Sequence, residues 1–282
     1  MLYLDHFRLP DQGMEDSFLE TIRRTCYPTK YPFHVFRYRQ MPELEFAPIT
    51  IFYGGNGSGK STLLNVMAEH LKLKRSTVFN RSPFFSDYVA MCSHRGTPPA
   101  DSRIITSDDI FDYLLNIRYL NENLDDQREK LLAEYRDVKY SKFQLRSLED
   151  YDELKKHVDA QRSSGSQYAR SRLMEAAPER SNGESALNYF TEAIRERALY
   201  LLDEPENSLS AQRQLDLRQF LADSVRFFGC QFVISTHSPF LLSLPGAKIY
   251  DLDVTPPQAR KWTELETVRI YRDFFKNHDK EF

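Results

Sequence analysis

The chain of 282 residues is 41% hydrophobic and 28% charged, which is typical of a folded globular protein and excludes a disordered or fibrous chain. Lys and Arg number 38 against 41 Asp and Glu, so no overall positive field indicates nucleic-acid binding. Three widely spaced cysteines and an N-terminus without a secretory signal favour a cytoplasmic protein without structural disulfides.

The first informative segment, residues 21–40, combines basic and aromatic side chains and contains no acidic residue. These side chains are Arg23, Arg24, Tyr27, Lys30, Tyr31, Phe33, Phe36, Arg37, Tyr38 and Arg39. Three interpretations stay open. The segment could contact the phosphates and bases of DNA or RNA, or stack on the adenine of a nucleotide. It could also form a β-hairpin with packed aromatic residues and a solvated basic face.

Four of the ten glycines lie within the next segment, which follows the apolar run 49–53 and precedes a stretch of helical spacing at 63–68. The pattern G-x-x-x-x-G-K-[ST] in this context predicts a phosphate-binding loop between a strand and a helix. Its residues are Gly54, Gly55, Asn56, Gly57, Ser58, Gly59, Lys60, Ser61 and Thr62. We expect Lys60 to contact the β- and γ-phosphates of ATP and Ser61 to bind Mg²⁺.

Two short apolar runs after the loop, 76–79 and 103–106, predict strands. Ser107 precedes two acidic residues and indicates the N-cap of a helix.

Residues 110–162 are charged and have no Pro or Gly, and their apolar residues fall on two helical stripes. A break near 139–142 would make them an antiparallel helical hairpin with arms of roughly 30–40 Å. The alternative is a helical subdomain that lies flat against the core. The polar stretch 162–167 predicts a flexible linker.

A second buried-strand pattern, 198–202, ends in two adjacent carboxylates, Asp203 and Glu204. In a protein with a phosphate-binding loop, an aspartate at a strand end binds Mg²⁺ through its water shell. We expect Asp203 to have this role. Glu204 is then placed to polarise the water that attacks the γ-phosphate.

The segment 227–247 has no Asp, Glu, Lys or Arg over the length of a membrane span. Its centre is the polar sequence Ser235-Thr-His-Ser-Pro239, so we predict a buried strand followed by a polar loop and no membrane insertion. His237 would lie at the carboxyl edge of a parallel sheet, where it can contact a γ-phosphate. Residues 247–252 predict a final strand, and 263–276 a closing helix.

Together these residues resemble the ABC-type branch of P-loop ATPases, and within it the RecF, SMC and OLD-like group of bacterial AAA family ATPases. The resemblance covers about 31–90 and 178–275. The signature of that branch is Leu-Ser-Gly-Gly-Gln, and Arg180-Ser-Asn-Gly-Glu-Ser185 stands in its place, with Ser181 and Gly183 retained. Ser181 also fits a helix N-cap, which is itself an anion site.

The resemblance implies an α/β fold with a mainly parallel sheet, an antiparallel β part near the N-terminus and a helical insert. It also implies a head-to-tail homodimer in which Ser181 of one copy contacts the γ-phosphate bound by the other copy. No glutamine stands where the family has one that links the metal to the helical subdomain, so Ser107 or Asp108 could substitute. Ser210 replaces an aspartate that transporter ATPases have.

We therefore expect an ATPase core formed by 1–106 and 171–282, with a helical insert at 107–170. The favoured function is an ATP hydrolase, with Mg²⁺, that acts mechanically on DNA, RNA or an effector protein in repair, chromosome maintenance or anti-phage defence. The alternative is an ATP sensor without hydrolysis that regulates a nuclease or toxin. A transporter subunit is disfavoured because the chain lacks the glutamine, the full signature and the aspartate.

Overall fold

The computed structural model describes residues 2–22, 26–141, 151–173 and 182–281. They form two compact units, 1–111 with 181–282, and 112–180. The helices of the first unit are α1 (Gln12–Thr21), α2 (Lys60–His70), α3 (Phe85–Ala90), the start of α4 (Ser107–Tyr140), α7 (Asn182–Ala193), α8 (Ala211–Phe228), α9 (Pro239–Leu242) and α10 (Glu266–Asn277), with 3-10 turns at Trp262–Glu264 and Asp279–Glu281.

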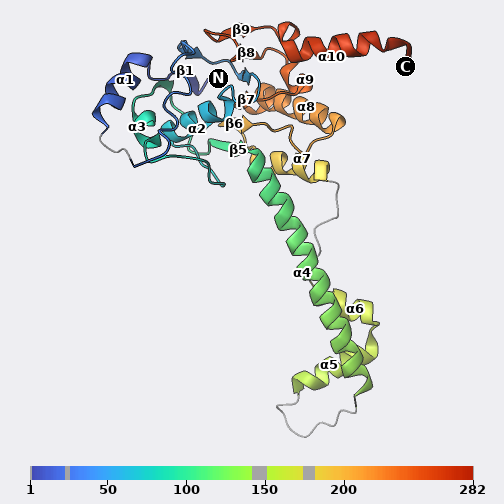
Figure 1. The fold of residues 1–282 in the computed structure, drawn as a ribbon. Coiled ribbons are helices and arrows are strands. Elements are labelled where there is room, and N and C mark those ends of the chain that lie inside the picture. Colours follow the sequence, from blue (N-terminus) through green and yellow to red (C-terminus); the bar gives the residue numbers. More distant parts are fainter. Residues whose placement is uncertain (1, 23–25, 142–150, 174–181, 282) are drawn as a thin grey trace. The chain divides into compact units, whose positions relative to one another are not determined.

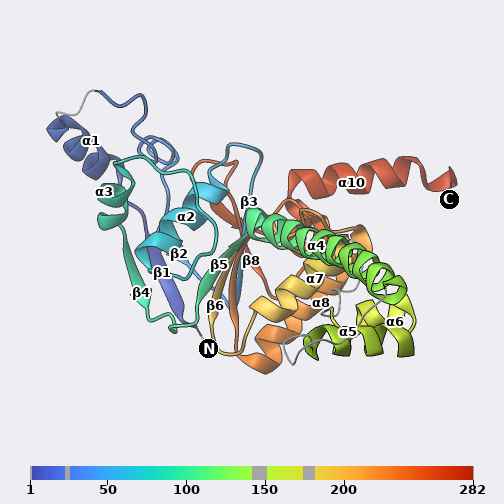
Figure 2. The ribbon, with the colours of Figure 1, turned by 90° about the horizontal axis from the view of Figure 1, so that it is seen from below.

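The larger sheet of the first unit has the strand order β5-β6-β7-β3-β8-β9 (Figure 1). Its strands are β3 (Ile49–Tyr53), β5 (Arg103–Thr106), β6 (Leu199–Asp203), β7 (Gln231–Ser235), β8 (Lys248–Asp251) and β9 (Gln258–Arg260). The first five strands in this order pair in parallel, and β9 pairs antiparallel with β8. Helix α2 covers one face, and α7 and α8 cover the other (Figure 2). The predicted mainly parallel α/β sheet is confirmed.

A smaller antiparallel sheet lies beside it, in the order β2-β1-β4. Its strands are β1 (Leu4–Arg8), β2 (Leu44–Glu45) and β4 (Ser93–Gly96). The buried side chain of Gln231 joins the two sheets, because its Oε1 accepts from the Tyr3 and Leu4 amides at 2.7 and 2.9 Å. Its Nε2 donates to the Leu4 carbonyl at 2.7 Å. The antiparallel part predicted near the N-terminus is thus fixed to the start of β7.

The second unit contains the remainder of α4, α5 (Tyr151–Arg162) and α6 (Gly165–Arg170). Its centre is Tyr168, which is buried against Tyr135 and under the guanidinium of Arg172. At 1.5 Å per residue, α5 is about 18 Å long, and it begins directly after residues that lie outside the described part of the chain, so the predicted hairpin stays a prediction. After α5 the chain turns at Ser164, which is the N-cap of α6.

Three local predictions are wrong. Residues 76–79 are bends and irregular chain, and this segment is joined to β5 by the bridge between Lys74 and Arg103. The stretch 162–167 is not a linker, because Ser164 and Gln167 form a capping box at the start of α6. Ser107 is not the N-cap of a helix, because it is already the first helical residue of α4. Asp109 Oδ2 instead accepts from the backbone amide of Thr106, the residue before Ser107, at 2.7 Å.

The predicted C-terminal helix is present as α10, but most of its apolar side chains do not pack on the core. Val268 is buried, whereas Tyr271, Phe274 and Phe275 are 46%, 54% and 53% exposed. The strand predicted in the segment 227–247, which has no Asp, Glu, Lys or Arg, is β7. No helix among the described residues has the length and apolar character needed to cross a bilayer.

We expect Gln231→Leu to lower the free energy of unfolding by about 3 kcal/mol, because the Tyr3 and Leu4 backbone groups lose their partner in a buried environment. Urea denaturation would measure the change. Gln219→Leu is the control, because the Gln219 side chain donates to the exposed side chain of Asp223. This variant should change the free energy of unfolding by less than about 0.5 kcal/mol. Equal stability of the two variants would contradict the role of Gln231.

Candidate functional site

The phosphate-binding loop connects β3 to α2, and its backbone needs glycine. Gly59 has a φ of 95°, which is left-handed, and a Cβ there would lie 2.9 Å from the Phe36 ring. A side chain at Gly54 would clash with Ser58, at 2.7 Å from its Oγ. The loop therefore adopts its turn only with these glycines in place.

Lys60, the first residue of α2, is buried within the loop. Its Nζ donates to the Gly54 carbonyl at 2.8 Å and to the Gly55 carbonyl at 3.3 Å, and lies 2.7 Å from Nε2 of His237. The side chain is only 4% exposed. Burial lowers the pKa of Lys60, and the nearby carboxylate of Glu204 opposes this shift. The ammonium is thus the centre of the site.

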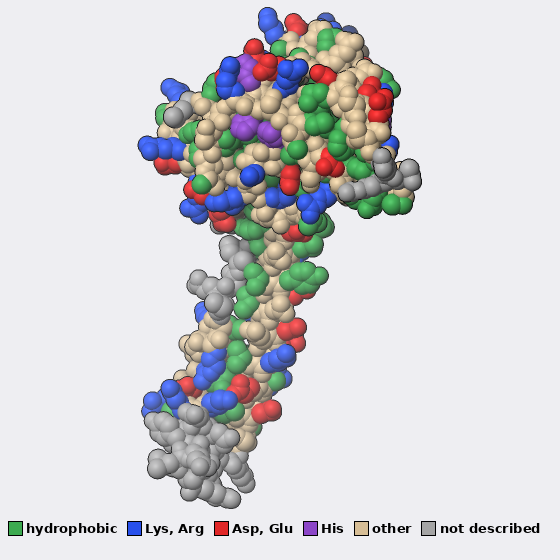
Figure 3. Space-filling view, turned by 90° about the vertical axis from the view of Figure 1, so that its left-hand side faces the viewer, with side chains coloured by type: hydrophobic (Ala, Val, Ile, Leu, Met, Phe, Trp, Pro, Cys, Tyr) green, Lys and Arg blue, Asp and Glu red, His purple; other side chains and the backbone are tan. Residues whose placement is uncertain are grey.

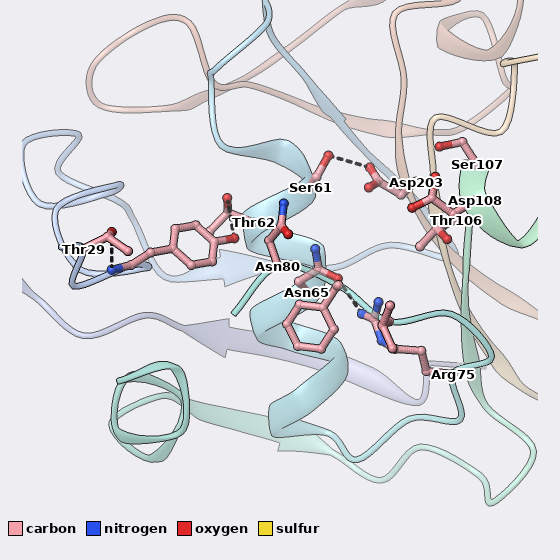
Figure 4. Close-up of a pocket in the computed structure, with 13 residues that line it drawn as sticks. Thr29, Ser61, Thr62, Asn65, Arg75, Asn80, Thr106, Ser107, Asp108 and Asp203 are labelled. Carbon is pink, nitrogen blue, oxygen red and sulfur yellow. Dashed lines mark hydrogen bonds between the residues drawn. The ribbon is translucent and has the colours of Figure 1, made fainter. Parts of the chain in front are cut away.

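Ser61 and Asp203 face each other in Figure 4, with Ser61 Oγ donating to Asp203 Oδ1 at 3.1 Å. Ser235 also donates to this oxygen. Burial raises the pKa of Asp203, and the hydrogen bonds from the two hydroxyls offset only part of this rise. A hydroxyl and a carboxylate in contact are hard oxygen ligands, which Mg²⁺ prefers. The pair predicted to bind the metal therefore fits Mg²⁺.

Glu204 has a left-handed backbone, with a φ of 49°, which is uncommon for a residue with a side chain. Its amide donates to the Ser235 carbonyl at 3.0 Å. Its Oε1 lies 3.9 Å from Lys60 Nζ and 3.6 Å from His237 Nε2. The carboxylate therefore joins the lysine and the histidine at the carboxyl edge of the sheet.

His237 follows β7, and Glu206 holds its backbone. Oε1 of Glu206 accepts from the His237 amide at 2.6 Å and from the Ser238 amide at 3.2 Å. Burial raises the pKa of Glu206. Burial, and then the Lys60 charge, lower the pKa of His237, which favours the neutral imidazole as the acceptor of a lysine N–H. Glu206 was not predicted as a site residue, although it follows Glu204 by only two positions.

Two further contacts on the loop were also not predicted. The Gly55 amide donates to both carboxylate oxygens of Asp253, at 2.9 and 2.8 Å. Arg39 donates to the Leu252 carbonyl at 2.6 Å and to the Gly57 carbonyl at 3.4 Å. Asp253 follows β8 and Arg39 precedes β3, so segments on both sides of the loop restrain its backbone.

The described residues of the basic and aromatic segment do not form a hairpin, because 31–40 form turns and bends. Phe33 and Phe36 are buried in the core, and Tyr31 donates to Thr62 Oγ1 at 3.1 Å. Tyr38 is 68% exposed, with the Arg37 guanidinium over its ring. This leaves stacking on adenine or on a nucleic-acid base as the open interpretations, with Tyr38 as the exposed ring. Arg23 and Arg24 lie outside the described residues.

A pocket of about 550 Å³ adjoins Ser61 and Asp203 (Figure 4). Its other polar lining includes Ser107 and Asp108, the two predicted substitutes for the missing glutamine. Arg75 also lines it and donates to Asn65 Oδ1 at 2.5 Å, with its guanidinium over the Phe79 ring. Ser107 and Asp108 therefore share a pocket with Ser61 and Asp203, the pair predicted to bind Mg²⁺.

Of the predicted signature, Ser181 lies outside the described residues. Gly183 lies in the first turn of α7, and its Cβ position is 3.5 Å from Arg213 Cγ and 3.7 Å from the Ser208 carbonyl. Ser210 is the N-cap of α8 and accepts from the Arg213 amide. The start of α7 thus packs on the loop that follows Asp203 and Glu204 in the chain.

A family model described as "AAA domain, putative AbiEii toxin, Type IV TA system" matches residues 70–243, which is more than half of the chain and begins after the phosphate-binding loop. No curated protein matches the chain.

Similar solved structures include an inward-facing, metal-chelate type ABC transporter, with 17% identity over 83% of this chain and 80% of that one, and a TM-score of 0.39. A dimeric ATP-binding cassette bound to ADP and phosphate has 15% identity, coverages of 79% and 90%, and a TM-score of 0.37. An Smc head domain from Pyrococcus furiosus has 13% identity, coverages of 82% and 94%, and a TM-score of 0.42.

The family model covers more than half of the chain, and the chain therefore belongs to this AAA-domain family.

Proposed function

We propose that this protein binds Mg-ATP at the phosphate-binding loop and hydrolyses its β–γ bond. The observation that supports this most is the convergence of Lys60, Glu204 and His237, which come from three separate segments, within 3.9 Å of one another. Their positions beside the hydroxyl–carboxylate pair provide a cation, a candidate base and metal ligands in one site.

In the proposed reaction, the Lys60 ammonium exchanges its loop carbonyls for phosphate oxygens. Ser61 and Asp203 hold Mg²⁺, which would neutralise charge on the phosphates when bound. Glu204 orients and polarises the attacking water. Once its contact with Lys60 is released, the His237 imidazole donates an N–H to a γ-phosphate oxygen. Glu206 keeps the histidine turn in place throughout.

We further propose that the active form is a head-to-tail homodimer, in which Ser181 and Gly183 of one copy contact the ATP held by the other. The position of Gly183 at the N-terminal turn of α7 supports this, because helix N-termini favour anions. A γ-phosphate that contacts both copies joins them, and its loss on hydrolysis releases them.

The work of this cycle is proposed to act in the cytoplasm on a protein or nucleic-acid partner. The family description names a toxin–antitoxin system, which supports an effector such as a toxin or nuclease. On the face of the first unit in Figure 3, basic and acidic side chains are interspersed, so this face does not favour DNA or RNA over protein.

Glu204→Gln should reduce the single-turnover hydrolysis rate by about a hundredfold or more, since the amide cannot act as a base, while Mg-ATP binding stays within about threefold. Rapid-quench measurement with radiolabelled ATP would test this. Glu43→Gln, at an exposed position, is the matched control and should react as wild type. Equal and negligible rates in wild type and Glu204→Gln, with ATP bound, would instead indicate the ATP sensor without hydrolysis.

The dimer can be tested with the same variant, because slow hydrolysis traps the ATP-bound state. We expect light scattering after size exclusion to give about twice the chain mass of 33.2 kDa for Glu204→Gln with Mg-ATP, and the single mass without it. Adding Ser181→Arg should restore the single mass with ATP still bound. A single mass at saturating Mg-ATP for Glu204→Gln would reject the proposed dimer.

The pKa of His237 lies below its ordinary value of 6.5, because burial and Lys60 disfavour the charged imidazole. As the pH falls, His237 is therefore protonated in the unfolded chain before it is protonated in the folded chain. Its contribution to the free energy of unfolding is fully present above about pH 6.5 and is lost at lower pH. His237→Gln should lose less thermal stability than wild type between about pH 7.5 and 5.5. Differential scanning calorimetry would show this, with His278→Gln as the control. Identical pH dependence of wild type and His237→Gln would refute it.

A further inference from the structure

The first turn of α8 has two consecutive side chains that reach different parts of the site. Arg213 Nη2 donates to Glu184 Oε1 at 2.7 Å, and its Nη1 donates to Asp216 Oδ2 at 2.9 Å. Glu184 lies in the first turn of α7, directly after Gly183. One end of α8 is thus fixed to the helix start that contains the signature glycine.

The next residue, Gln214, reaches the histidine turn. Its Oε1 accepts from Ser238 Oγ at 2.6 Å, and its Nε2 donates to the Leu209 carbonyl at 2.9 Å. Ser238 is buried, directly follows His237, and caps α9 through the Phe240 amide. The same helical turn is therefore hydrogen-bonded to the segment that contacts Lys60.

The loop between these contacts leaves little room for independent movement. Leu209 is buried, and the Gly183 Cβ position lies 3.9 Å from the Ser210 amide nitrogen. Glu206, earlier in this loop, holds the His237 amide. A shift of the histidine turn must therefore move this loop or α8, and both contact the start of α7.

We propose that Arg213 and Gln214 are positioning residues that couple the histidine turn of a subunit to the start of α7 in the same subunit. This inference rests on the proposed function, in which His237 contacts the subunit's own ATP and the start of α7 contacts the ATP of the partner. The pair then transmits the state of one ATP site to the other, in a chain that has Ser210 where transporter ATPases have an aspartate.

Coupling requires that ligand binding at one end changes the free energy of the other end, and hydrogen exchange of the α7 amides reports this directly. The experiment uses the full chain with Ser181→Arg, which prevents dimerisation in the proposed function and so isolates the coupling within one subunit. Exchange is followed by mass spectrometry with and without a non-hydrolysable Mg-ATP analogue. We expect the analogue to slow exchange in α2 and, by about fivefold or more, in α7.

Arg213→Met and Gln214→Leu, each added to this background, should abolish the slowing in α7 and leave that in α2. Gln219→Leu, on the same helix but bonded to Asp223, is the matched control and should keep both. Two results would overturn the inference. One is that the analogue still slows exchange in α7 in both variants. The other is that it slows exchange in α2 but not in α7 of the chain with Ser181→Arg alone. Absence of protection in α2 would show that no nucleotide binds, which would reject the proposed function and this inference with it.

Discussion

The contact between Ser235 and Asp203 joins the carboxyl ends of two parallel strands, and the geometry of the candidate site depends on it. In the register of β6 and β7 these residues are direct partners, and Phe52 of β3 is level with Ser235. Three strands therefore end at the same height. The phosphate-binding loop, the paired carboxylates and the histidine each follow one of these ends, so the parallel register, which the Ser235–Asp203 contact joins, brings them to one edge of the sheet.

The parts of this site that could be predicted from the sequence are those with strong local patterns. The loop around Lys60 has a fixed spacing between a strand and a helix, and Asp203 follows a run of buried residues. The contact of Asp253 with Gly55 joins residues 198 positions apart, and no local spacing indicates it. Glu206 had a signal in its nearness to Glu204, but its partner is a backbone amide, which any sequence provides.

The wrong predictions have physical reasons of the same kind. Residues 76–79 have side chains that favour strands. The segment just before them pairs with β5 through an isolated bridge at Lys74, and this pairing does not continue into 76–79. Ser164 and Gln167 are polar residues common in linkers, and the same side chains satisfy free amides at a helix start. The aromatic residues of 31–40 could bind a ligand or fill a core, and Phe33 stacks on Phe18 with ring centroids 5.1 Å apart.

The hydrogen bonds of the Lys60 ammonium have a consequence for ligand selectivity. An ammonium has three N–H groups, and the Gly54 and Gly55 carbonyls and the His237 imidazole offer three acceptors. An anion with few oxygens gains little by displacing partners that already satisfy the lysine. In the proposed function, a triphosphate presents many oxygens and would also reach the loop amides, Ser61 and Asp203, so we expect this site to favour it over orthophosphate and other small anions.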